Sequence, residues 1–201
     1  MDAQLILSAT IIATSAAACI YALRHELDVS WRTASLSAIA IIALTATFAF
    51  AGLHILAAAA LGCIIPACVI ICEIDRRHFI IPDVLVATLA IVAIAAPFTS
   101  RGEQALGALI AGGLFFAVRT GFRQLRGAHG LGLGDLKLAA VMGALLGPSL
   151  ALAAIAVAAG ATAAALALRS ARTVNSAPNA APFGVGLSAA LAIAVMFEAW
   201  R

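Results

Sequence analysis

The chain has 201 residues, of which 64% are hydrophobic and only 10% are charged. A soluble domain covers its surface with charged side chains, which usually make up about a quarter of its residues. This composition therefore excludes a water-exposed globular surface and indicates a protein surrounded by a lipid bilayer. The net charge of +3 is small and spread along the chain, which argues against nucleic acid as a partner.

A helix needs about 20 apolar residues to cross a bilayer. Residues 5–23 form the first such segment. The run 33–72 contains no Asp, Glu, Lys or Arg and is long enough for two more, with a break expected at Gly52-Leu53-His54. Later spans are expected at 84–98, 105–118, 136–146, 148–168 (after a turn at Gly147-Pro148) and beyond a polar linker at 170–182. The sequence therefore predicts an all-α fold, a polytopic transmembrane helix bundle of about eight spans, built as a single domain over residues 1–201.

Basic residues fall mainly on one side of this predicted topology. Of the 12 lysines and arginines, only Arg101 and Arg201 lie on the other side. The rich side receives Arg24, Arg32, Arg76, Arg77, Arg119, Arg123, Arg126, Lys137, Arg169 and Arg172. By the positive-inside rule the rich side is cytoplasmic, and both chain termini are then expected outside.

Two polar segments, residues 73–83 and 130–137, fall on the predicted cytoplasmic side. Each carries an aspartate at the end of an apolar helix: Asp75 in the first segment and Asp135 in the second. Ionisable residues at membrane depth are costly and are usually functional. Two carboxylates that meet can hydrolyse a peptide bond, one as general base on water and the other as general acid. We therefore expect Asp75 and Asp135 to be catalytic and to share one proton.

The second segment is rich in glycine around Asp135. Without Cβ atoms, Gly132 and Gly134 allow another backbone to come close, and an extended substrate strand is one candidate. The plainer interpretation of Asp135 is a helix cap, because Asp at a helix N-terminus binds free N–H groups. A helix N-terminus favours a negative charge and a C-terminus disfavours it, so we expect Asp135 to be the ionised base and Asp75 the protonated acid; Arg76 and Arg77 would favour the reverse.

Other charged residues in the two segments also have plain interpretations. Asp75 would pair with Arg76 or Arg77 at the interface, and Asp83 would cap the helix that follows Pro82. Lys137 would extend toward the interface with its apolar stem buried. The spacing of the histidines in these segments is not that of a zinc motif, and we expect no metal or other cofactor.

Three motifs resemble those of the type IV prepilin peptidases, which are membrane aspartic proteases of the GxGD type. They are GLGLGDLKL at residues 130–138, the segment from Asp75 to Ile81-Pro82-Asp83, and Pro182-Phe183-Gly184. The resemblance implies that Asp75 and Asp135 are the catalytic pair. It also assigns motif and substrate-approach positions to Gly132, Gly134, Pro82, Asp83 and Lys137. Where many members carry an acidic residue, this chain has His129.

The resemblance further implies what such a protein does. It would cleave the leader peptide of type IV prepilins, pseudopilins or tight-adherence pilins at the cytoplasmic face of the bacterial inner membrane, in pilus assembly or protein secretion. Its partners would be the substrate helix and the bilayer. Residues 24–33 are too few for the cytoplasmic cysteine domain of long-form members, so the chain resembles the short forms, and N-methyltransferase activity is not expected.

Two other classes of function fit a small polytopic protein. A proton-coupled transporter would hold carboxylates near the middle of the membrane, often within broken helices. The middle of each predicted span here holds none. An inactive scaffold of a pilus machine is the other alternative, although both aspartates are present.

Overall fold

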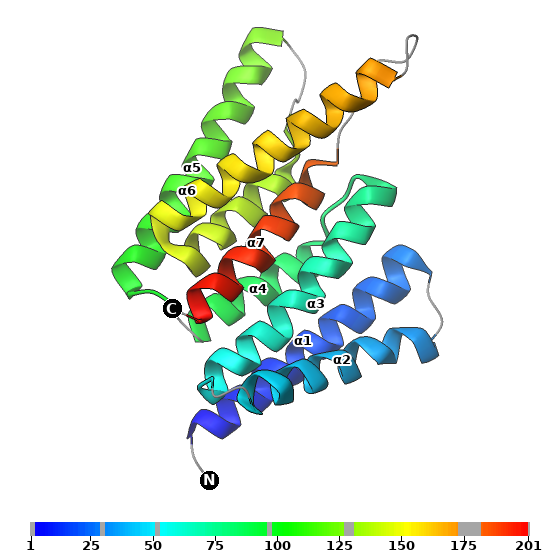
Figure 1. The fold of residues 1–201 in the computed structure, drawn as a ribbon, viewed down its shortest axis with the longest axis vertical. Helices are drawn as coiled ribbons and strands as arrows, with labels where there is room; N and C mark the ends of the chain where they lie inside the picture. Colours follow the sequence, from blue (N-terminus) through cyan, green and yellow to red (C-terminus); the bar gives the residue numbers. More distant parts are fainter. Residues whose placement is uncertain are drawn as a thin grey trace.

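A computed structural model describes residues 3–28, 31–50, 53–95, 98–126, 131–172 and 182–200. Over these residues the chain forms seven helices packed side by side, which confirms the all-α prediction (Figure 1). The helices are α1 (Ala3–Leu27), α2 (Trp31–Phe50), α3 (Ile55–His78), α4 (Asp83–Ala95), α5 (Arg101–Arg126), α6 (Leu133–Arg172) and α7 (Phe183–Ala199). Among the described residues, three segments are long and apolar enough to cross a membrane: Ile55–His78, Arg101–Leu125 and Leu133–Leu168.

The helix boundaries agree with the predicted breaks, with one correction. Between α2 and α3, Leu53 and His54 are not helical, as predicted for that break. The residues that follow Val118 were expected in a polar loop, but α5 continues as a helix to Arg126. The reason is that arginine is a good helix former and reaches polar surroundings from a helix on its long side chain.

Helix α6 reverses its direction at Gly147, where the sequence predicts a turn. Gly147 has φ 71° and ψ 174°, which are not helical, and the proline that follows cannot donate a backbone hydrogen bond. Gly147 lies next to Thr99 and Glu103, at the start of α5. The second leg, drawn in yellow to orange, then returns toward the start of α7 (Figure 1), where Ala161, Thr162, Ala165 and Leu166 line a cavity with Val185.

Small residues bring the helix backbones close together. A Cβ added to Gly107 of α5 would overlap the carbonyl oxygen of Gly143 in α6, and the reverse substitution would overlap Gly107. Gly62 of α3 packs against Ile41 and Thr45 of α2 in the same way. Lipid gives little hydrophobic drive for helix association, so such close packing holds the bundle together.

Four helix ends meet at one end of the bundle: the end of α3 and the starts of α4, α6 and α7. We call this the dyad end, because it holds both predicted catalytic aspartates. The start of α1 and the end of α7 lie at the opposite end (Figure 1). The fold therefore gathers segments that are far apart in the sequence around one small region.

Candidate active site

Asp75 lies in the last turn of α3 and is buried, with 5% of its surface exposed. Its Oδ2 atom accepts a hydrogen bond from the Val185 N–H in the first turn of α7, at 3.1 Å. Its backbone carbonyl accepts another from Phe79, which ends α3 in the left-handed conformation at φ 56°. Both the backbone and the side chain of Asp75 are therefore anchored.

The arginines next to Asp75 bind a different carboxylate. Arg76 and Arg77 both donate hydrogen bonds to Glu73, one turn earlier on the same helix. The plain interpretation of Asp75, an ion pair with one of these arginines, is therefore not the arrangement that the structure describes. The Asp75 carboxylate faces α7 instead.

Asp135 lies in the first turn of α6 and is half-buried. Its carboxylate accepts a hydrogen bond from the Gly132 N–H, so part of the predicted capping role is present. A Cβ on Gly132 would lie only 3.0 Å from the Asp135 Oδ2 atom, which explains glycine at this position. The charges of Asp135 and Asp75 are close enough to interact. The structure thus brings the two aspartates together, while their catalytic roles stay predictions.

The expected proton assignment, with Asp135 ionised and Asp75 protonated, took into account only the C-terminus of α3 near Asp75 and the N-terminus of α6 near Asp135. The structure adds the N-terminus of α7, whose Val185 N–H binds the Asp75 carboxylate. A backbone N–H at a helix N-terminus stabilises a negative charge. Both aspartates therefore have this support, and helix ends alone do not assign the proton.

Gly134 has a packing role in the structure. A Cβ added to Gly134 would lie 2.8 Å from the Cβ of Ile81, a buried residue of the segment between α3 and α4. The space beside Gly134 is therefore filled by the chain's own Ile81. The role of Gly132 and Gly134 in substrate approach stays a prediction.

Asp83 and Lys137 form an ion pair between the two motif segments. The Lys137 Nζ atom lies 2.7 and 2.8 Å from the two carboxylate oxygens of Asp83. Pro82 holds the cap position of α4, because its carbonyl accepts the Val86 N–H. The prediction that Asp83 caps α4 is therefore wrong, whereas Lys137 extends to an exposed position as expected and pairs there with Asp83. A salt bridge between residues far apart in the chain leaves no local signal in the sequence.

Arg119 holds the glycine-rich segment against α5. Its guanidinium donates a hydrogen bond to the carbonyl of Leu131, just before α6. The sequence indicated only a topological role for this arginine, and no motif would have revealed the bond. Gly130 and His129 of the same segment lie outside the described residues, and His78 at the end of α3 is exposed.

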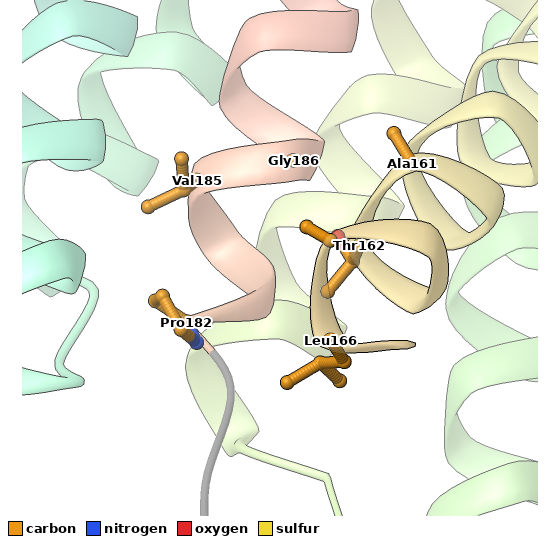
Figure 2. A pocket seen from close by; sticks show the side chains of 7 residues that line it. Ala161, Thr162, Leu166, Pro182, Val185 and Gly186 are labelled. Carbon is orange, nitrogen blue, oxygen red and sulfur yellow. The ribbon is translucent and has the colours of Figure 1, made fainter. Parts of the chain in front are cut away.

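An apolar cavity of about 220 Å³ lies between the second leg of α6 and the start of α7. Figure 2 shows Ala161, Thr162 and Leu166 on α6 beside Val185 and Gly186 on α7 and Pro182, the residue before α7. Val185 links the cavity to the Asp75 carboxylate through its N–H. The sequence did not identify this cavity, because no motif connects residues 161–166 with residues 182–186.

Comparison with known proteins agrees with the motifs. No curated protein and no solved structure matches the chain. The family model described as "Type IV leader peptidase family" matches residues 62–168, more than half of the chain, and this stretch includes Asp75 and Asp135. The match supports a membrane protein with a leader-peptidase type of protease function. The chain belongs to the type IV leader peptidase family.

Proposed function

We infer that the protein is an aspartic endopeptidase that cleaves the leader peptide of type IV prepilin-like proteins, with Asp75 and Asp135 as its catalytic pair. One observation carries this proposal. The Asp75 carboxylate lies beside Gly184 and Asp135 follows Gly134, and both glycines pack against the side chain of Ile81, which brings the two aspartates to one small region at the end of an apolar bundle. Within the family, such a pair has an evident use in peptide-bond hydrolysis.

The chemistry needs one ionised and one protonated carboxylate. The ionised aspartate takes a proton from water, which attacks the scissile carbonyl, and the protonated aspartate polarises that carbonyl and then gives its proton to the leaving amine. Two like charges this close cannot both ionise readily, so the pair keeps one proton between them. Hydrogen bonds from Val185 and Gly132 hold the two carboxylates in orientation.

The proposed topology counts α6 as two spans, because the chain reverses at Gly147. The bundle would then have about eight spans, of which α4 and α7 are apolar but shorter than the roughly 20 residues that cross a bilayer. Arg76 and Arg77 at the end of α3 and Lys137 at the start of α6 lie at the dyad end, and Arg119 of α5 binds Leu131 just before α6. The positive-inside rule makes this end cytoplasmic in the inner membrane, with both chain termini outside.

The substrate would enter as an apolar helix with an extended leader at its cytoplasmic end. The helix would pack beside the bundle and bring the scissile bond to the depth of the two aspartates. The apolar cavity between α6 and α7 opens beside Val185 and has room for one substrate side chain near the scissile bond. Pilin, pseudopilin and tight-adherence pilin precursors are the proposed substrates.

Cleavage of a co-expressed prepilin in membranes tests the proposal. Wild type should shorten the prepilin, whereas Asp75→Asn and Asp135→Asn should insert normally and leave it intact. Glu103→Gln, in the first turn of α5, is the matched control for a carboxylate-to-amide change and should cleave normally. Normal cleavage by either aspartate variant would overturn the pair, and loss in Asp83→Asn instead would move the catalytic role to Asp83.

A further inference from the structure

Ile81 sits between the two segments that carry the aspartates. It belongs to the short stretch between α3 and α4, and only 8% of its surface is exposed. One end of its side chain touches the backbone at the start of α6: a Cβ on Gly134 would lie 2.8 Å from the Ile81 Cβ. The Cδ1 atom reaches the start of α7 as well: a Cβ on Gly184 would lie 2.9 Å from it, and a Cβ on Gly134 would lie 3.5 Å from it. The side chain thus fills the gap between two backbones.

Each of these backbones is directly linked to one aspartate. Gly134 is the residue before Asp135. A Cβ on Gly184 would lie 2.9 Å from the Asp75 Cγ, and the next residue, Val185, donates its N–H to that carboxylate. A change in the size of the Ile81 side chain would therefore move the start of α6 relative to Asp75.

We propose that Ile81 is a positioning residue, a rigid spacer whose side chain sets the separation at which Asp75 and Asp135 meet. Isoleucine suits this role, because branching at Cβ restricts its χ1 angle. Because the side chain is closely packed on both sides, loss of one methyl group would let the neighbouring backbones shift. A shift of about 1 Å in catalytic groups can lower a rate by roughly a hundredfold.

The spacer role makes a different prediction from simple core filling. Ile81→Val removes only the Cδ1 atom that touches Gly184. Ile64→Val removes the same atom from a fully buried position of α3, far along the helix from Asp75, and serves as the control. Both changes should lower stability to a similar extent. Only Ile81→Val should lower kcat per folded enzyme, by about tenfold or more, with KM little changed.

A second variant pair tests the contact itself. Gly184→Ala should lower kcat, because the new methyl group meets both Ile81 Cδ1 and the Asp75 carboxylate. In the Ile81→Val background this added methyl group has part of the space that Cδ1 left, so the same change should cost less in kcat. Additive effects of the two changes would contradict the spacer role.

The experiment is prepilin cleavage by purified protein in lipid vesicles, with rates normalised to the folded fraction. The inference rests on the proposed function, and the outcomes separate the two. If wild type cleaves and Asp75→Asn also cleaves, the proposed function fails. If Asp75→Asn and Asp135→Asn are inactive but Ile81→Val keeps the wild-type kcat, only the spacer role is overturned.

Discussion

Replacing Gly143 with alanine tests the crossing of α5 and α6, which holds the first leg of α6 in place. The new Cβ would overlap the Gly107 carbonyl oxygen and lie 2.8 Å from the Ala108 nitrogen. Favourable contacts of carbon with other heavy atoms lie at about 3.5–4.0 Å, so the backbones must separate by at least roughly 0.7 Å. Overpacking a tight core costs about 1–3 kcal/mol, and contact with a rigid backbone places this substitution at the upper end or beyond.

Gly113→Ala is the matched control, because no atom outside its own helix lies within 4 Å of the added Cβ. Alanine in a helix interior is favoured over glycine by about 0.5–1 kcal/mol, so the control should be neutral or slightly more stable. Reversible unfolding in mixed micelles with increasing denaturing detergent measures the free energy of unfolding of both variants. The packing argument predicts a loss of about 3 kcal/mol or more for Gly143→Ala. Equal stability of the two variants would refute it.

Three further predictions concern the dyad end. Asp83→Lys should lower kcat/KM about fivefold, because an exposed ion pair contributes about 1 kcal/mol. The charge exchange Asp83→Lys with Lys137→Asp should restore most of the lost kcat/KM. Failure of the exchange to restore it would show that the ion pair does not position the two motif segments. Arg119→Gln should lower kcat more than Arg123→Gln, which is exposed, because only Arg119 binds the Leu131 carbonyl; equal rates would contradict this. Ala165→Leu should discriminate by at least about tenfold against substrates with a large side chain beside the scissile bond, whereas Ala164→Leu, outside the cavity lining, should not. Cleavage rates on a set of substrates that differ at that position would check this prediction.

The sequence predicted the helical elements well, because lipid demands long apolar segments and tolerates few charges within them. The break near His54 and the reversal at Gly147 both lie at residues that favour a turn. The end of α5 was missed, because arginines at an interface suit a helix as well as a loop. Its true end lies at Arg126.

The site was predictable only as a pair of aspartates with their neighbouring motifs. The hydrogen bond from Val185 to Asp75 joins residues 110 positions apart, and the ion pair of Asp83 with Lys137 joins residues 54 apart. Such contacts follow from how the helices pack, which hydropathy does not encode. The contacts of Ile81 are harder to predict still, since an aliphatic residue in a motif carries no chemical signal of its own.

The most direct test of the catalytic pair is a double-mutant comparison with purified protein in vesicles. Single-turnover cleavage of one prepilin would be measured for wild type, Asp75→Asn, Asp135→Asn and the double variant. Residues that act as one unit lose about as much singly as together. The account therefore predicts that each single variant loses at least about a thousandfold and that the double variant loses no more. A single variant that keeps near wild-type cleavage, or losses that multiply in the double variant, would contradict a shared two-aspartate site.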